Sequence, residues 1–203
     1  MWHGTVKPSG ANVRSGPSPG ASKVADLPPG TSVDVDTWVA GAEVYPTFAT
    51  WAHLADGSGY IYGTALQPLT LPYTLPPEMA GMTGNWLDVD LTQNVIAAVQ
   101  GQTIKNVFPT SPGRPGFETT RGLHHVRYQR PADDMKGPGY YVRGVRWVSY
   151  FLPDGSAIHA RTWDVDSISF GVPSSHGCLG VQFDAAAYLY QFVSPGTPIN
   201  IHD

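Results

Sequence analysis

The sequence is poor in cysteine: it has a single residue of this type, Cys178, among 203 residues. A lone cysteine cannot form a disulfide within the chain, so its role is either packing or reactivity. The residue type alone leaves both open, because free cysteine is often a small core residue. One cysteine is also compatible with either redox compartment.

Charge and long apolar runs are scarce as well. Charged residues make up 14% of the chain, and the net charge of −4 comes with no basic run, which argues against nucleic acid or an anionic membrane as the main partner. No apolar stretch approaches the ~18–20 residues that span a bilayer. The start of the chain lacks the basic and apolar regions of a signal peptide. Composition leaves open a cytosolic location or an export signal absent from this chain.

Glycine, proline and aromatic residues are abundant, with 23 Gly, 19 Pro, six Trp, ten Tyr and seven Phe. This combination predicts a mainly β protein with many short strands. Residues 1–68 are expected to form a small β-barrel, with strands near 11–13, 32–35, 51–54 and 60–62. Residues 69–83 follow as a proline-rich, extended linker, because prolines at 72, 76 and 77 disfavour a helix or a central strand.

Residues 84–203 form a second β-rich pattern. Alternation of apolar and polar residues predicts strands at 86–91, 94–99, 103–107, 123–128, 140–142, 147–151, 158–160 and 198–201. The segment 184–193 has apolar residues three and four apart and is the expected helix, with Asp184 at its N-cap.

The cysteine lies in the run Ser174-Ser175-His176-Gly177-Cys178-Leu179-Gly180, where small neighbours leave the sulfur approachable. A thiol with an ordinary pKa is mostly protonated at neutral pH and needs a histidine as base. His176 is close in sequence, but its side chain and that of Cys178 point in different directions in a tight loop. His159, on a predicted strand, is the other candidate. The amides of His176, Gly177 and Cys178 are candidates for an oxyanion hole.

His159, followed after a gap by Ser175-His176-Gly177-Cys178, resembles the signature of the L,D-transpeptidase (YkuD-like) family. The likeness extends over about 84–203 and includes the segments 86–91, 111–120 and 196–199. It implies a β-rich L,D-transpeptidase-type sandwich with one C-terminal helix. Residues 1–68 are similar to bacterial SH3-like domains through 12–18, 27–31 and 59–61. Such modules accompany cell-wall enzymes, where they bind wall polymers or only space the domains.

The resemblance implies a cysteine acyltransferase that acts on peptidoglycan stem peptides without a cofactor or metal. Cys178 would expel D-alanine from a tetrapeptide donor, and an amine acceptor would give a 3→3 cross-link; water would give L,D-carboxypeptidase activity. His159 matches the general acid/base, oriented by the Ala160 carbonyl, and His176 a supporting histidine. Ser175 matches a hydroxyl that shapes the loop. Carbapenem acylation and a location outside the cytoplasm follow from the same analogy.

One position departs from the family pattern. The family usually has Asn or Arg two residues after the cysteine, where this chain has Gly180, and this puts donor affinity in doubt. Tyr141, Trp163 and Arg161 are candidates for contacting the donor, and each is equally a candidate packing or surface residue.

Two other interpretations remain. His159, His176 and Cys178 are all of zinc-ligand type, but the chain lacks His-x-x-Glu-His and Cys-x-x-Cys motifs. The loss of the usual side chain at Gly180 also allows a wall-binding protein without activity.

Overall fold

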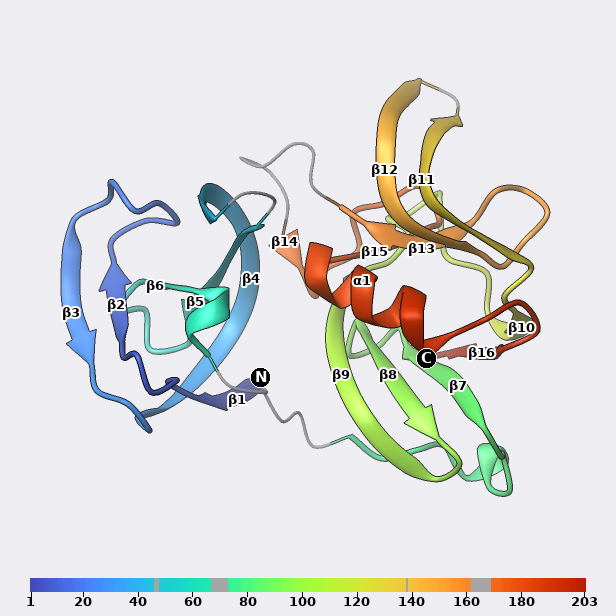
Figure 1. The fold of residues 1–203 in the computed structure, drawn as a ribbon, viewed down its shortest axis with the longest axis horizontal. Coiled ribbons are helices and arrows are strands. Elements are labelled where there is room, and N and C mark those ends of the chain that lie inside the picture. The colour runs from blue at the N-terminus through green and yellow to red at the C-terminus, as the bar shows by residue number, and fades with distance from the viewer. Residues whose placement is uncertain (46–47, 67–72, 138, 162–168) are drawn as a thin grey trace. The chain divides into compact units, whose positions relative to one another are not determined.

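The computed structural model describes residues 1–45, 48–66, 73–137, 139–161 and 169–203. The described residues are mainly strands, which confirms the predicted fold class (Figure 1). They form two compact units. One consists of the chain up to Tyr73 together with the short strand Ser169–Phe170, and the other contains the remaining described residues.

The first unit is a single curled sheet in the described residues, with the strand order β1-β4-β5-β6-β2-β3 and β14 paired with β4. Large aromatic side chains fill its centre: Trp51 is buried, and Trp2 packs edge-on against Trp38. The predicted strands lie within β2, β4, β5 and β6, whereas β14 was not predicted. Its elements are β1 (Trp2–Thr5), β2 (Ala11–Arg14), β3 (Lys23–Leu27), β4 (Ser32–Tyr45), β5 (Phe48–Leu54), β6 (Tyr60–Tyr62), η1 (Gly63–Ala65) and β14 (Ser169–Phe170).

The second unit has, in its described residues, one sheet with the order β10-β16-β7-β8-β9-β15-β13-β12-β11. The pairs β16–β7 and β13–β15 are parallel, and the others are antiparallel. Its elements are η2 (Pro77–Met79), β7 (Asn85–Asp90), β8 (Val95–Gln100), β9 (Thr103–Ser111), β10 (Gly122–His125), β11 (Tyr128–Gly137), β12 (Tyr140–Tyr150), β13 (Ala157–Ala160), β15 (Leu179–Val181), α1 (Phe183–Phe192) and β16 (Pro198–His202).

Several predicted elements differ from the structure. The expected strands 140–142 and 147–151 are parts of one strand, β12, which pairs with an unpredicted strand, β11. Strand β11 is mostly exposed and polar, so it lacks the alternation that reveals a half-buried strand. The expected strand 123–128 ends at His125 in β10. Of the linker 69–83, residues 69–72 lie outside the described residues, and a short 3-10 turn occupies Pro77–Met79.

Helix α1 begins one residue earlier than expected. Its N-cap is Gln182, and Asp184 lies inside the first turn, where its carboxylate interacts favourably with the helix dipole. The face carrying Ala185, Ala186 and Leu189 is buried in the core of the unit. No helix in the described part of the chain is both long enough and apolar enough to cross a bilayer.

The core of the second unit determines which side chains can face outward from β13 and β15. Ile158 and Ala160 on β13, and Leu179 and Val181 on β15, are all buried in one apolar cluster. Successive side chains on a strand point to opposite faces. The residue between the two core positions of β13, His159, therefore lies on the other face.

Truncation of Leu179 tests this core. Leu179 is fully buried, so Leu179→Ala is expected to lower the free energy of unfolding by about 2–5 kcal/mol. The matched control is Leu123→Ala on β10, whose side chain is 55% exposed and whose truncation is expected to change stability by less than about 0.5 kcal/mol. Urea denaturation of both variants measures the difference; equal losses would contradict this packing.

Candidate active site

The parallel pairing of β13 and β15 brings Cys178 to His159. In this pairing His159 lies opposite Gly180, and Cys178 directly precedes β15. Because Leu179 and Val181 point into the core, Cys178 and Gly180 face the same side of the sheet as His159. Cys178 and His159 are therefore diagonal neighbours in the register, although they are far apart in sequence. The Cys178 sulfur lies 4.0 Å from the Gly155 carbonyl oxygen.

The imidazole of His159 is held in one tautomer. The residue is 4% exposed, and its Nδ1 lies 2.9 Å from the carbonyl oxygen of Ala160. A carbonyl only accepts hydrogen bonds, so Nδ1 carries the proton and Nε2 keeps its lone pair. Burial, together with the nearby charge of Arg161, lowers the pKa of His159 to about 4. The imidazole is thus neutral at neutral pH and able to accept a proton at Nε2.

The thiol of Cys178 is also neutral at rest. Burial of the sulfur raises the pKa of Cys178 to about 11, and the charge of Asp154 acts in the same direction. The backbone N–H of Ala157 opposes this shift. The site therefore holds a neutral thiol beside a neutral imidazole rather than a thiolate–imidazolium pair.

Hydrogen bonds within the loop shape the turn that leads to the cysteine. The Ser175 hydroxyl donates to the Cys178 carbonyl oxygen at 2.6 Å and accepts from the Gly177 amide at 3.1 Å. Gly177 has a φ of 111°, a conformation that residues with a side chain rarely adopt. The expectation that three amides line an oxyanion hole needs correction, because the Gly177 N–H is used inside the loop. The amides of His176 and Cys178 remain candidates.

The segment after β9 supports this loop from outside. The Pro112 carbonyl oxygen accepts from the amides of both Ser174 and Ser175. The Thr119 hydroxyl donates to the Gly177 carbonyl oxygen at 3.1 Å and accepts from the Gly113 amide at 2.9 Å. The loop is therefore held both by hydrogen bonds within it and by hydrogen bonds from the segment after β9.

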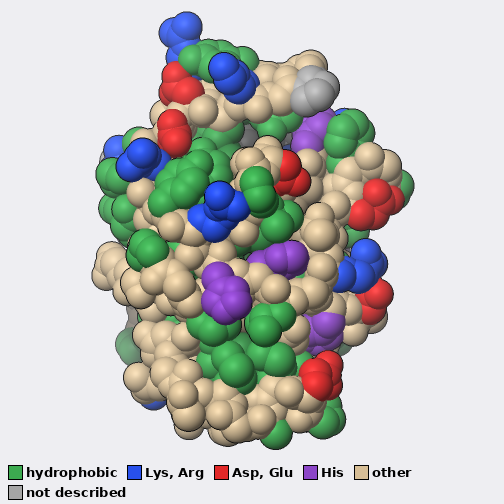
Figure 2. Space-filling view, turned by 90° about the vertical axis from the view of Figure 1, so that its right-hand side faces the viewer, with side chains coloured by type: hydrophobic (Ala, Val, Ile, Leu, Met, Phe, Trp, Pro, Cys, Tyr) green, Lys and Arg blue, Asp and Glu red, His purple; other side chains and the backbone are tan. Residues whose placement is uncertain are grey.

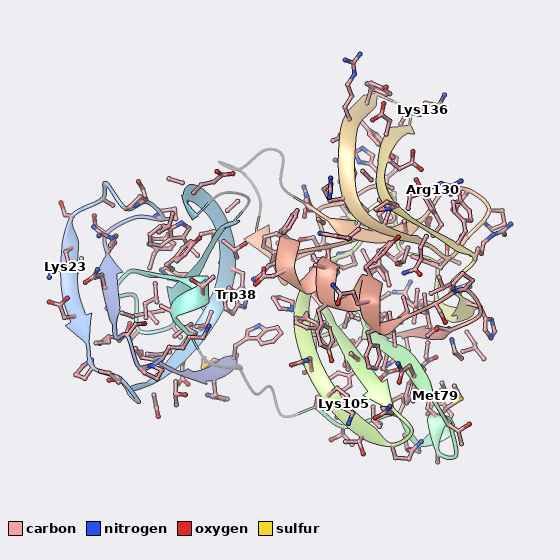
Figure 3. All side chains as sticks on the ribbon, viewed as in Figure 1. Lys23, Trp38, Met79, Lys105, Arg130 and Lys136 are labelled. Atoms are coloured by element: carbon pink, nitrogen blue, oxygen red, sulfur yellow. The ribbon has the colours of Figure 1, made fainter. Side chains whose placement is uncertain are left out.

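A cavity of about 420 Å³ opens beside Cys178, and His176 lies in its wall. Part of its lining comes from the hairpin of β11 and β12, which projects from the sheet (Figure 1). Tyr128 and Tyr150 line it and stack on each other at 4.6 Å between ring centroids. Lys136 also lines it and lies near the free end of the hairpin, as Figure 3 shows. The cavity offers aromatic surface, the cation of Lys136 and the carboxylates of Asp134 and Asp154 to a ligand that approaches the thiol.

The structure places the predicted donor contact Tyr141 away from the cavity. Tyr141 is 54% exposed, its hydroxyl donates to Asp134 at 2.6 Å, and it is not among the described residues that line the cavity. The adjacent Tyr140 lines the cavity instead. Sequence alone could not choose between them, because neighbouring residues of a strand face opposite sides. Trp163 lies outside the described residues.

Arg161 occupies the space beside Gly180. A Cβ added to Gly180 would lie 3.1 Å from the Arg161 Cδ, and the guanidinium donates to the Ser174 hydroxyl at 2.6 Å. The missing side chain at Gly180 therefore leaves room for the stem of an arginine that reaches Ser174 in the loop before the cysteine. This arginine directly follows β13 and does not come from the position two residues after the cysteine.

Within the described residues, no group of three or more His, Cys, Asp and Glu side chains is arranged to hold a metal ion. On the face that Figure 2 shows, lysine and arginine side chains are scattered among neutral and hydrophobic ones rather than joined in one basic patch.

The raised pKa of Cys178 predicts its reactivity without substrate. Because the thiol stays protonated at neutral pH, alkylation by uncharged iodoacetamide should be slow and should keep rising with pH toward the pKa of about 11. Asp154→Asn removes a charge that raises this pKa and should shift the profile to lower pH. Mass spectrometry of alkylated protein measures the rates. A plateau below about pH 9, the range of an ordinary thiol, would contradict the assignment.

Comparison with known proteins places the chain in a family. Residues 84–201 match the model of the L,D-transpeptidase catalytic domain, YkuD. L,D-transpeptidase 2 of Mycobacterium tuberculosis is 27% identical over 121 residues, which are 55% of this chain but only 29% of that relative.

Solved structures share the fold. An L,D-transpeptidase from Mycobacterium smegmatis aligns with 85% of this chain and 100% of its own, at 19% identity and a TM-score of 0.54. An L,D-transpeptidase solved in complex with imipenem aligns with 84% of this chain and 82% of its own, at 17% identity and a TM-score of 0.53. The resemblance seen in the sequence is confirmed, and the chain belongs to the L,D-transpeptidase (YkuD) family.

Proposed function

We propose that this chain is a cysteine acyltransferase that joins peptidoglycan stem peptides by 3→3 cross-links through a thioester on Cys178. The observation that carries the proposal is the shared face of β13 and β15. There Cys178 and His159 occupy neighbouring positions on adjacent segments, and the His159 Nδ1 is bound to the Ala160 carbonyl, so Nε2 is the nitrogen proposed to act as base. Membership of the L,D-transpeptidase family supports the substrate class.

The first half-reaction forms the thioester. The Cys178 sulfur attacks the carbonyl carbon of the L,D peptide bond of a tetrapeptide donor while its proton passes to Nε2 of His159. In this proposal the amides of His176 and Cys178 stabilise the resulting oxyanion. Collapse of the tetrahedral intermediate breaks the C–N bond, and the His159 imidazolium returns its proton to the departing amine of D-alanine.

The second half-reaction consumes the thioester. An amine of a neighbouring stem peptide attacks the acyl carbon and gives up a proton to His159, and the sulfur leaves and regains a proton from the imidazolium. The product is an amide cross-link, and the enzyme returns to its neutral pair. With water as the acceptor, the same steps release a shortened tripeptide, which is L,D-carboxypeptidase activity.

Donor binding is proposed to use the cavity beside Cys178. Its aromatic wall suits the apolar parts of a stem peptide, Lys136 suits a carboxylate, and Asp134 and Asp154 suit an amine. Arg161 is proposed to hold the loop through Ser174 and to take over part of the role of the side chain missing at Gly180. This compensation favours an active enzyme over an inactive wall-binding protein. Tyr140, which lines this cavity, is the tyrosine proposed to contact a donor there, whereas the predicted contact Tyr141 does not line it. Trp163 stays a predicted donor contact outside the described residues.

Action on stem peptides implies a location outside the cytoplasm, in the cell wall or secreted. It also implies that carbapenems acylate Cys178, because these compounds present a strained acyl group to the same nucleophile. A family member solved in complex with imipenem supports this part of the proposal.

Residues 1–68 are proposed to be an SH3-like module that binds wall polymers. If so, the chain with inactive Cys178→Ala should sediment with purified sacculi, because binding does not require the thiol. Assay of pellet and supernatant measures the bound fraction. A protein that stays in the supernatant at low salt would indicate that this unit only spaces the catalytic domain.

The reaction is tested with muropeptides. Wild-type protein incubated with disaccharide-tetrapeptides should yield dimers whose mass corresponds to two stems minus D-alanine, and Cys178→Ala should yield none. His159→Gln should reduce the rate by at least about a hundredfold, because the thiol loses its base. Mass spectrometry of the products is the measurement.

The products also separate the alternatives. Shortened monomers without dimers would establish the carboxypeptidase instead of the cross-linking enzyme. Product formation that survives in Cys178→Ala would overturn the thioester mechanism.

A further inference from the structure

A second histidine beside the thiol, His176, has its protonation set by an arginine. Nη2 of Arg114, in the segment after β9, lies 2.8 Å from Nε2 of His176. A guanidinium can only donate hydrogen bonds, so Nε2 must accept and cannot carry a proton. His176 is therefore the neutral tautomer with its proton on Nδ1.

Aromatic side chains hold the ring of His176 in place. Phe117 meets it edge-on at 4.7 Å between centroids, and Tyr140 lies at 4.8 Å on a tilted plane. The Arg114 guanidinium also lies over the Phe117 ring, 4.8 Å from its centre. The imidazole thus has a fixed orientation as well as a fixed tautomer.

The backbone of Arg114 is tied to the catalytic loop itself. Its amide donates to the Ser175 carbonyl oxygen at 3.0 Å, and its carbonyl oxygen accepts from the Phe117 amide at 2.8 Å. Gly113 forms a parallel bridge with Ser175, and a Cβ on Gly113 would collide with the Phe117 carbonyl oxygen. The backbone of Arg114 is therefore joined directly to the loop that carries His176.

We propose that Arg114 is a positioning residue for acyl transfer: it holds His176 as the neutral Nδ1–H tautomer, so that this imidazole is a hydrogen-bond donor in the wall of the cavity that contains Cys178. An oxygen of the acyl donor is the group that such a donor would bind. This part of the inference rests on the proposed function, whereas the tautomer rests on the contact with Arg114 alone.

The charges around His176 favour the neutral form. Arg114 and Arg161 both act on it, and Tyr140 and Cys178, which also line the cavity, are uncharged at neutral pH. Burial and the two arginines lower the pKa of His176. Removal of the Arg114 charge should therefore raise this pKa and let His176 gain a proton in mildly acidic solution.

The test compares Arg114→Met, which removes donor and charge, with Arg114→Lys, which keeps both. Nitrogen NMR of histidine-labelled protein, with His176→Asn for assignment, gives the tautomer and pKa of His176. Mass spectrometry gives the rate of Cys178 acylation by imipenem. Arg121→Met is the matched control. Arg121 is bound to Asp203 by two hydrogen bonds, and the substitution removes the same charge from the protein as Arg114→Met does.

We expect wild-type His176 to be Nδ1-protonated, and Arg114→Met to show mixed tautomers, a higher pKa and acylation slowed by about tenfold to a hundredfold. Arg114→Lys should restore most of the rate, and Arg121→Met should match the wild type. An unchanged tautomer and pKa in Arg114→Met would overturn the proposal, as would slowed acylation that Arg114→Lys does not rescue. If wild type is neither acylated nor active on muropeptides, the proposed function fails, whereas a tautomer change in Arg114→Met would still support the hold of Arg114 on His176.

Discussion

The parallel pairing of β13 with β15 is the constraint on which the site depends. Burial of Ile158 and Ala160 on one strand, and of Leu179 and Val181 on the other, fixes both the register and the outward face. A register shift of one residue would turn the thiol and the imidazole to opposite sides of the sheet. The relative position of Cys178 and His159 is thus determined by the packing of these core side chains.

The same burial gives the pair its chemical character. Removal of water disfavours the charged form of each group, so it raises the pKa of the Cys178 thiol and lowers that of the His159 imidazole. An enzyme with a standing thiolate reacts with many electrophiles. A neutral thiol is a weaker nucleophile than a thiolate, so burial lowers the reactivity of Cys178 toward electrophiles in general.

The sequence was sufficient for the mainly β class and for the two residues that the register brings together, because their spacing is a recognisable pattern. It was insufficient for features that depend on which face of a strand is exposed or on contacts between residues far apart in sequence. Strand β11 is mostly exposed and polar, so it lacks the alternation of apolar and polar residues that predicts a strand. The choice between Tyr140 and Tyr141 depends on which face of β12 lines the cavity. The contact between Arg114 and His176 could not be predicted, because an arginine in a glycine- and proline-rich loop is common and the two residues are far apart in sequence.

Strand β14 has a consequence for how the protein can be divided. Its two residues pair with Val39 and Trp38 of β4, and Phe170 is buried, although in sequence they directly precede the segment that leads to the cysteine. A cut at the proline-rich linker would therefore remove a strand from the first unit and expose the backbone edge of β4. Exposed edges recruit other strands and promote aggregation. The first compact unit is thus discontinuous in sequence. Transfer of this unit into another protein would require either strand β14 itself or another segment that pairs with the edge of β4.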